Sequence, residues 1–228
     1  MRYAALIFAL GLYPLSAQAG LLSPAEVDAS RYLPPPPAAG SAVEKREIQE
    51  LHAIAKRSSK DLKAVAAHDA KDESPDIFND AIGFDATTKP ETSKLLKMVM
   101  EEEDGDSKAA KAYFHRLRPY AVDTSLKTCE PVKPKKANAA NSYPSGHSSL
   151  AFSMGVVLAS LIPEKSQPIL ARALEYADHR LVCGVHYRSD IVAGQQFGTI
   201  LALKLMQNPT FRAQMDLARA ELGAEATH

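Results

Sequence analysis

Residues 144–162 read Pro-Ser-Gly-His-Ser-Ser-Leu-Ala-Phe-Ser-Met-Gly-Val-Val-Leu-Ala-Ser-Leu-Ile, and this stretch decides the fold class. From Ser148 to Ile162 it contains no charged residue, so a helix built from it would be apolar on every side. Such a helix belongs in the core of a protein or in a membrane. It is shorter than the roughly 20 apolar residues that a membrane span needs, and we therefore predict a fully buried core helix.

The last part of the chain supplies three further helices. Residues 191–206 are again apolar on all sides, with Lys204 as the single charge, and we expect a second fully buried helix there. Residues 167–182 are amphipathic, and residues 209–222 fit a polar final helix. No run alternates like a β-strand, so the sequence predicts an all-α, single-domain helical bundle. A chain of 228 residues with 46% hydrophobic content can bury such a core.

Helices are also predicted in the first half. Apolar residues recur at helical spacing over residues 43–70, as one long helix or two shorter ones. A helix is expected over residues 92–103, with Asp104-Gly105-Asp106 ending it, and another from there to Arg118. The second should end at Arg118 because Pro119 disfavours helical geometry in the residue before it.

Three segments lack helical periodicity. The proline run Tyr32-Leu33-Pro34-Pro35-Pro36-Pro37, within residues 20–42, predicts an extended arm that packs across the body or on a neighbouring subunit. Residues 71–90 are rich in Asp, Ser, Pro and Gly and should form a loop. Residues 119–143 are a second loop, whose lysines are expected to be mostly solvated, although long loops often border binding sites.

The N-terminus has the pattern of a secretory signal. A basic start at Arg2 is followed by an apolar run over residues 4–15 and by the small-residue site Ser16-Ala17-Gln18-Ala19. We therefore expect cleavage after Ala19 and a periplasmic or secreted protein without a membrane span. A membrane helix is the alternative, but this run is too short and contains Pro14. The expected organisation is a signal peptide, a proline-rich arm and a helical domain, at residues 1–19, 20–42 and 43–228.

Charge and cysteine content restrict the function. The chain has 27 basic and 27 acidic residues, so no overall field favours nucleic acid or an anionic membrane, and any affinity for anions must be local. In an oxidising compartment the two cysteines, Cys129 and Cys183, favour a disulfide. A buried free thiol and a catalytic thiol are the alternatives. No spacing of Cys and His residues indicates a zinc site.

Two polar segments are candidate anion-binding sites. Lys111 and Arg118 are seven residues apart, two turns of a helix, so from one helix face they would grip one anion. The same spacing is also common on solvated helix faces. Just before the buried helix, Ser145 can cap it and Gly146 lets an anion approach its free N–H groups. A plain helix start would explain Ser145 but not the polar ring of His147.

A third polar segment, residues 179–190, holds His186 and Asp190 four residues apart. A histidine needs a partner for one ring nitrogen before the other becomes a good nucleophile, and Asp190 is near enough to be that partner. Arg180, six residues upstream of His186, can hold an anion in front of the ring. A polar helix end in water would contain the same residue types, so the inference depends on the three segments together.

The order and spacing of these segments resemble the three-part signature of the class A bacterial nonspecific acid phosphatases. That family belongs to the superfamily of type 2 phosphatidic acid phosphatases and vanadium haloperoxidases. The matching residues are Lys111, Arg118, Pro119, the Pro-Ser-Gly-His of residues 144–147, Arg180, His186 and Asp190. The proline run and the export signal extend the resemblance over most of the mature chain.

The resemblance implies a fold and a function. The fold would be the all-α bundle of that superfamily, and the activity would be metal-independent hydrolysis of phosphate monoesters, with phosphotransfer as a second activity to consider. Small-molecule monoesters and inorganic phosphate would be the ligands. No cofactor and no metal would be required, and the protein would form a homo-oligomer.

The resemblance also implies a role for each residue. His186 would be the nucleophile that forms a phosphohistidine, with Asp190 fixing its tautomer. His147 would protonate the leaving alkoxide and then activate water. The equatorial phosphate oxygens would be held by Lys111, Arg118, Arg180, Ser145 and the N–H groups of Gly146 and His147.

One position departs from the family pattern. The family usually has Ser before the Arg of the third segment, whereas this chain has His179. We expect His179 to be exposed. The difference bears on the orientation of Arg180, on substrate preference and on the pH optimum.

Two other functions are kept as alternatives. An exported protein that only binds phosphate would need the cationic residues but would have no use for His147 or for the pair of His186 and Asp190. A vanadium haloperoxidase would use the same pocket, because vanadate mimics the transition state, but those enzymes are generally much longer. Relatives that act on lipid phosphates usually have several membrane spans, and none is predicted after Ala19.

Overall fold

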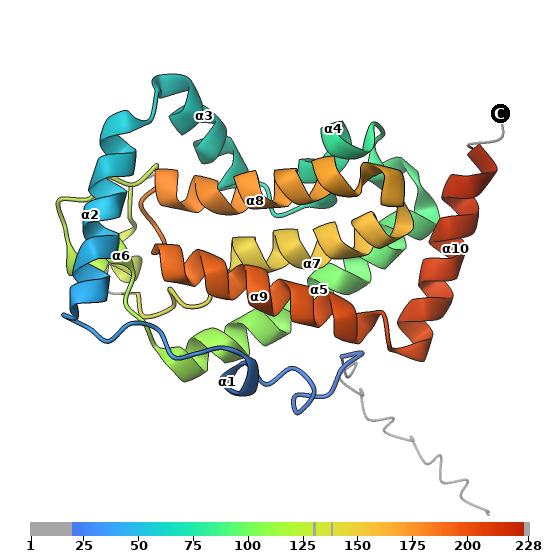
Figure 1. Cartoon of the computed structure of the whole chain (residues 1–228), viewed down its shortest axis with the longest axis horizontal. Coiled ribbons are helices and arrows are strands. Elements are labelled where there is room, and N and C mark those ends of the chain that lie inside the picture. Colours follow the sequence, from blue (N-terminus) through green and yellow to red (C-terminus); the bar gives the residue numbers. More distant parts are fainter. Residues whose placement is uncertain (1–19, 130, 138, 226–228) are drawn as a thin grey trace, which may run out of the picture.

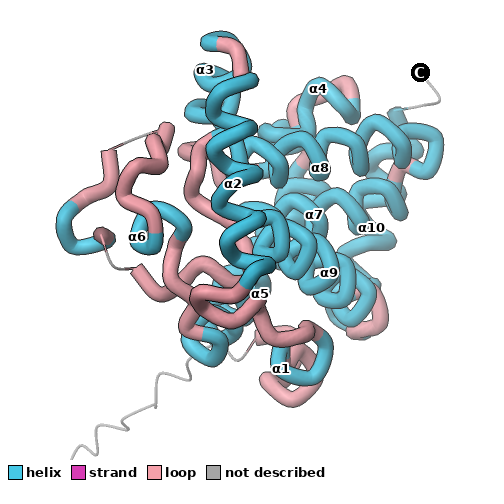
Figure 2. Tube along the Cα trace, turned by 60° about the vertical axis from the view of Figure 1, so that its left-hand side comes forward, coloured by secondary structure: helices cyan, strands magenta, loops and turns pink. Residues whose placement is uncertain are grey.

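The computed structural model describes residues 20–129, 131–137 and 139–225. Within these ranges the chain forms helices and loops and no β-strand (Figure 2), which confirms the predicted all-α fold. The α-helices are α1 (Ala29–Tyr32), α2 (Ala42–Arg57), α3 (Lys60–Asp69), α4 (Asn79–Ile82), α5 (Pro90–Phe114), α6 (Pro119–Val122), α7 (Gly146–Leu161), α8 (Ser166–Val182), α9 (Arg188–Leu205) and α10 (Pro209–Glu225). Short 3₁₀ helices are η1 (Pro75–Phe78), η2 (Ala86–Thr88), η3 (Pro134–Lys136) and η4 (Pro163–Lys165).

Helix α7 is the centre of the bundle. It packs against α8 and α9, and α5 contacts it as well (Figure 1). These helices run roughly along the long axis of the molecule, while α2 crosses one end and α10 closes the other (Figure 1). The end next to α2 gathers the first residues of α7 and α9, the last residues of α8, and the long loop that precedes α7.

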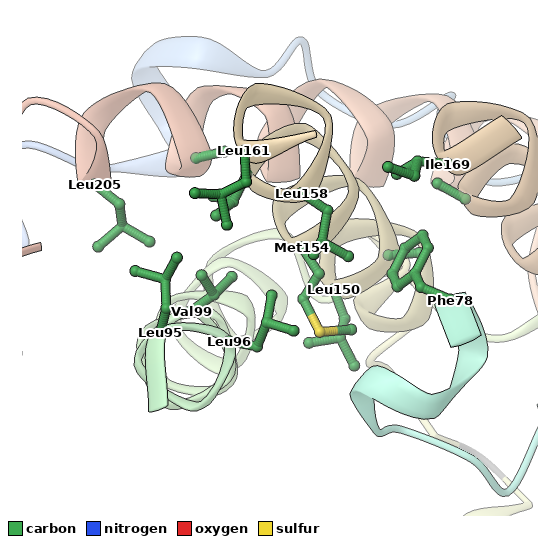
Figure 3. Packing of buried hydrophobic residues seen from close by; sticks show 14 of the residues in the cluster. Phe78, Leu95, Leu96, Val99, Leu150, Met154, Leu158, Leu161, Ile169 and Leu205 are labelled. Atoms are coloured by element: carbon green, nitrogen blue, oxygen red, sulfur yellow. The ribbon is translucent and has the colours of Figure 1, made fainter. Parts of the chain in front are cut away.

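The core forms where side chains from five elements interdigitate around α7 (Figure 3). They come from η1 (Phe78), α5 (Leu95, Leu96, Val99), α7 (Leu150, Met154, Leu158, Leu161), α8 (Ile169) and α9 (Leu205). Burying one side chain of this kind stabilises the fold by about 2 kcal/mol, so the cluster holds α7 firmly in the middle. The core helix predicted from Ser148 is confirmed, and it begins at Gly146.

Helices α7 and α9 approach closely because glycines line their contact. A Cβ added at Gly194 would lie 2.5 Å from the Ser145 carbonyl oxygen and 2.7 Å from the Ser148 Cβ. Gly198 repeats this close contact one turn further along α9. The Ser145 N–H also donates to the Asp190 carbonyl at 3.0 Å. The first turns of the two helices are therefore locked side by side.

Helix α5 is longer than predicted. It runs unbroken from Pro90 to Phe114, so the break expected at Asp104-Gly105-Asp106 and the helix end expected at Arg118 are both wrong. A glycine inside a helix costs about 1 kcal/mol, and the apolar side chains that α5 buries on either side of it outweigh that cost. The helix ends where His115 adopts a left-handed φ of 49°.

The structure also decides two expectations about other helices. Residues 43–70 form two shorter helices, α2 and α3, and the Ser59 hydroxyl caps α3 by accepting the Leu62 N–H at 3.1 Å. The expectation that α9 is buried all round is wrong, because Val192 and Leu203 are 41% and 48% exposed. One face of α9 lies at the surface, where apolar residues carry little penalty when scattered singly.

The proline-rich arm packs across the body of its own chain, one of the two placements expected. The N–H groups of Leu21 and Leu22 donate to the Glu102 carboxylate at 2.8 and 3.0 Å. Further along, the Tyr143 hydroxyl donates to the Pro34 carbonyl at 2.7 Å. The predicted signal peptide, residues 1–19, lies outside the described residues. Among those described, no helix combines the length and the apolar character that crossing a membrane requires.

We expect Gly194→Ala to destabilise the protein by about 1 to 3 kcal/mol, because the added methyl group must push α9 away from α7. Gly105→Ala is the matched control, since no atom lies within 4 Å of the Cβ it would add, apart from its chain neighbours and the nearby backbone of its own helix. That control should be neutral or should stabilise the protein by up to about 1 kcal/mol. Urea unfolding of both variants measures the difference, and equal effects would contradict the tight contact.

Candidate active site

A cavity of about 440 Å³ opens where α7 begins. Its wall combines α5, the loop before α7, the start of α7 and the end of α8. Six of the eight predicted site residues line it, namely Lys111, Arg118, Gly146, His147, Arg180 and His186. The other two, Ser145 and Asp190, are fully buried and do not line it.

Lys111 and Arg118 reach the cavity from different elements. Lys111 lies in the last turn of α5, whereas Arg118 follows the helix in an extended segment with φ −69° and ψ 150°. The prediction that they project from one helix face is therefore wrong, although both line the same cavity. Arg118 Nε donates to Asn141 Oδ1 at 3.0 Å, which orients the guanidinium.

Hydrogen bonds fix the tautomer of His186. Arg118 Nη1 lies 2.8 Å from Nε2 of the ring, and Asp190 Oδ2 lies 3.3 Å from Nδ1. A guanidinium can only donate, so Nε2 must present a lone pair, and Nδ1 then carries the proton that faces Asp190. Burial lowers the pKa of His186 well below its usual value, and the charges of Arg118 and Arg180 lower it further. The ring is therefore neutral, with its lone pair on the Arg118 side.

Asp190 is held by residues that the sequence did not reveal. Its carboxylate accepts from the Ser142 hydroxyl at 2.6 Å, the Tyr187 N–H at 2.9 Å and Arg116 Nη1 at 2.7 Å. Arg116 is itself buried, lies 3.7 Å from the centre of the Tyr187 ring and pairs with Glu47 of α2 at 2.8 Å. No sequence spacing marks Arg116 or Glu47, because they meet Asp190 only in the fold.

The start of α7 forms part of the cavity wall. Ser145 is the N-cap, and its hydroxyl accepts the Ser148 N–H at 3.3 Å, which matches the predicted cap. A Cβ at Gly146 would lie 2.6 Å from Lys111 Nζ, so only a glycine lets the ammonium lie against the helix start. The free N–H groups and the helix dipole at this end favour an anion.

Three cations converge on the cavity, of which Arg180 is buried and Lys111 and Arg118 are half-buried. Burial lowers the pKa of Lys111 and of Arg118, and burial together with the charge of Arg118 lowers that of Arg180 to about 10. Among the described residues, Nε and Nη1 of Arg180 are buried without a hydrogen-bond partner. Glu103 lies near Lys111, but burial raises its pKa to about 7, so it offsets the positive charge only in part. Such a set of cations favours an anionic ligand.

The ring of His147 is held through both nitrogens. Nε2 lies 3.3 Å from the Ala70 carbonyl oxygen, and Nδ1 lies 3.0 Å from the Glu73 carboxylate. The ring stacks on Tyr176 with centroids 5.6 Å apart. Burial and the charge of Arg180 lower the pKa of His147, whereas Glu73 opposes the shift. Sequence reasoning missed Glu73 and Tyr176, which belong to no recognisable motif.

The comparison with known proteins agrees with this geometry, since residues 95–213 match the family model described as the PAP2 superfamily. The chain belongs to the PAP2 superfamily. It is 31% identical to an acid phosphatase of Zymomonas mobilis, over 84% of this chain and 74% of the relative. It is also 31% identical to non-specific acid phosphatases of Providencia stuartii, over 86% and 81%, and of Salmonella typhimurium, over 88% and 82%. These PAP2 relatives confirm the predicted family and enzyme class.

A solved PAP2 structure supports the fold assignment. The chain resembles a transmembrane PAP2 type phosphatidylglycerolphosphate phosphatase from Bacillus subtilis with a TM-score of 0.53 and 18% identity. The match covers 73% of this chain and 85% of that one. The helical arrangement predicted from the sequence is therefore that of the PAP2 superfamily.

His179 is the position at which this PAP2 chain departs from the expected signature, and the prediction that it is exposed is wrong. Its side chain is 3% exposed, and Nδ1 lies 2.6 Å from Asp69 Oδ2. Arg172 Nη2 lies 2.8 Å from the other oxygen of the same carboxylate. The pair ties α8 to the end of α3, so His179 is buried by a contact that its own sequence context does not indicate.

The predicted disulfide is present. Cys129 and Cys183 are bonded, so neither alternative with a free thiol holds. Both residues line the cavity, and the bond joins the loop before α7 to the end of α8 next to Arg180. Lys133 and Lys136 of the same loop also line the cavity, which places part of residues 119–143 at the site.

Asp69→Asn tests the buried contact of His179 through pH. Burial would raise the pKa of Asp69, but hydrogen bonds from His179 and Arg172 prevail and lower it to about 2. A depressed carboxyl pKa adds stability that is present above the unfolded value of about 4 and is lost as pH falls through the folded value. The variant should therefore lose about 2 to 3 kcal/mol near about pH 6, and the gap should close between about pH 4 and pH 2. Urea unfolding across this range measures it; a constant gap would contradict the assignment.

Proposed function

We propose that this acid phosphatase homologue hydrolyses phosphate monoesters without a metal ion, through a phosphohistidine formed on His186. The observation that supports this most directly is the orientation of the His186 ring. The lone pair of Nε2 lies on the side of Arg118, and the N–H of Nδ1 donates a hydrogen bond to Asp190. Because burial and nearby cations lower the pKa of His186, protonation of the ring is disfavoured and the lone pair of Nε2 stays available.

In the first step, substrate phosphate displaces the Arg118 N–H from the ring and lies among the cations. Nε2 of His186 attacks phosphorus, the ester P–O bond breaks, and the leaving oxygen takes a proton from His147. Positive charge that develops on His186 is balanced by Asp190. The equatorial oxygens are held by Lys111, Arg118, Arg180 and the N–H groups at the start of α7.

In the second step, the now neutral His147 takes a proton from water, which attacks phosphorus as the P–N bond breaks and inorganic phosphate forms. An alcohol in place of water would give phosphotransfer by the same route. Ser145 contributes by capping α7 and thereby holding its N–H groups in place. The positive charge that a metal ion would bring is supplied here by three side chains, which supports a metal-free reaction.

We also propose that the chain is exported, with its signal peptide cut after Ala19. The bonded pair of Cys129 and Cys183 supports this, since disulfides persist in oxidising compartments such as the periplasm. Assembly into a homo-oligomer stays a prediction.

We expect purified protein to release p-nitrophenol from p-nitrophenyl phosphate in mildly acidic buffer, and excess EDTA should leave the rate unchanged. Lack of turnover from acidic to neutral pH would contradict the phosphatase and favour a protein that only binds phosphate. Activity that returns only after metal is added would contradict the metal-free mechanism. The matching assay for the haloperoxidase alternative is the oxidation of bromide by peroxide in the presence of vanadate. We expect no oxidation of bromide.

Substitutions of the two histidines should have different effects on activity. His186→Asn should lower turnover by about 10⁴-fold or more and abolish the acid-labile, base-stable phosphoenzyme, because the atom that bonds phosphorus is gone. His147→Asn should slow alkyl phosphates by about 100- to 10,000-fold. It should slow p-nitrophenyl phosphate much less, because that leaving group needs little protonation. Rapid-quench labelling with ³²P measures both, and a His186 variant that still labels on histidine would refute the assignment.

A further inference from the structure

The leaving-group side of the cavity can be located from His147 if the proposed function holds. Its Nε2 faces the backbone carbonyl of Ala70, and stacking on Tyr176 restrains the ring from turning over. Nδ1 is therefore the nitrogen available to exchange a proton with the leaving oxygen. A substrate must bring its ester oxygen to that atom, and the alcohol part of the substrate then extends from there toward the mouth of the cavity.

Glu73 lies on this side of the cavity. Its Oε1 is 3.0 Å from Nδ1 of His147, and its side chain is 62% exposed. The hydrogen bond with His147 lowers the pKa of Glu73 to about 2, and the charges of Lys111 and Arg180 act in the same direction although burial opposes them. The carboxylate is therefore negative at the acidic pH where the enzyme is expected to work.

The loop that carries Glu73 is anchored at its neighbours. The Tyr176 hydroxyl donates to the Asp72 carbonyl, and the Ser74 hydroxyl and N–H donate to the Asp72 carboxylate at 2.6 and 3.1 Å. Ser74 also caps η1 by accepting the Asp76 N–H at 3.2 Å. The exposed carboxylate of Glu73 can turn aside for a substrate, but the fixed backbone keeps it beside the leaving group.

Charge around the cavity is unevenly distributed. Among the described residues that line it, Glu73 is the one acidic side chain. The cationic side chains that line it come from four parts of the chain, and they are Lys71, Lys111, Arg118, Lys133, Lys136 and Arg180. Those cations alone would attract a second anionic group on a substrate. Glu73 opposes that attraction at the position next to the ester oxygen.

We propose that Glu73 is a specificity-determining residue that selects the leaving group by charge. It favours phosphate monoesters whose alcohol part is neutral or cationic over monoesters that carry a second anionic group next to the ester oxygen. Two negative charges about 6 Å apart, at an effective dielectric constant of about 40, repel strongly enough to change a rate about tenfold.

The test compares Glu73→Gln with the parent on glycerol 2-phosphate and on its carboxylate analogue, 2-phosphoglycerate. The leaving group of both substrates is a secondary alkoxide. Any change in proton donation by His147 therefore affects both substrates and cancels in the ratio of their kcat/KM values. At about pH 6 the carboxylate of the analogue is ionised. We expect the preference for glycerol 2-phosphate to fall about tenfold in Glu73→Gln, and to fall further in Glu73→Lys.

Glu175→Gln is the matched control, because that carboxylate is 59% exposed, pairs with Arg172 and does not line the cavity. It should leave the preference unchanged. An equal loss on both substrates in Glu73→Gln, or no change on either, would overturn the inference while leaving the phosphatase in place. A parent protein that hydrolyses neither substrate nor p-nitrophenyl phosphate would instead refute the proposed function, and this inference with it.

Discussion

The buried carboxylate of Asp190 is the interaction on which the candidate site depends. Its two oxygens face His186, Ser142, the Tyr187 N–H and Arg116, so four donors from three parts of the chain converge on one group. A buried carboxylate costs several kcal/mol unless it is matched in this way, and removing one partner leaves a charge without compensation. His186, the proposed nucleophile, is therefore oriented by the same contacts that join α9 to the segment after α5 and, through Arg116, to α2.

The position of the site follows from how α7 and α9 pack. Small residues at Gly194 and Gly198 allow the two helices to touch along their first turns, so that both helix starts open toward one end of the bundle. Backbone N–H groups without helical partners gather there, together with the positive ends of the dipoles. Lys111, Arg118 and Arg180 add full charges to that end, and an anion among these buried and half-buried cations would offset the cost of their desolvation.

The features that could be predicted from the sequence are encoded within a few consecutive residues. The features that could not be predicted depend on contacts between elements that are far apart in the chain. The apolar helix after His147, its serine cap and the three cationic segments are each visible within a few residues. The break expected at Gly105 is wrong because packing along α5 outweighs local propensity. The helix end expected at Arg118 is also wrong, because α5 ends at Phe114, and this second error is what placed Lys111 and Arg118 on one helix face. His179 is buried against the carboxylate of Asp69, which lies over 100 positions away in the sequence, so no local pattern predicts this contact. The same holds for the residues that support the two histidines, namely Glu47, Glu73, Arg116, Ser142 and Tyr176.

The two histidines of the site are each paired with a carboxylate, and the environments of those carboxylates differ in a way that suits different tasks. Asp190 is fully buried and saturated with donors, so it holds His186 in one tautomer throughout. Glu73 is largely exposed and contacts the ring of His147 only through Nδ1. This contact can therefore form and break during the reaction. A nucleophile needs one fixed lone pair, whereas a group that first gives and then takes a proton must change its charge within each cycle. The rigid pair therefore suits the proposed role of His186 as nucleophile, and the loose pair suits the proposed role of His147 as acid and then base.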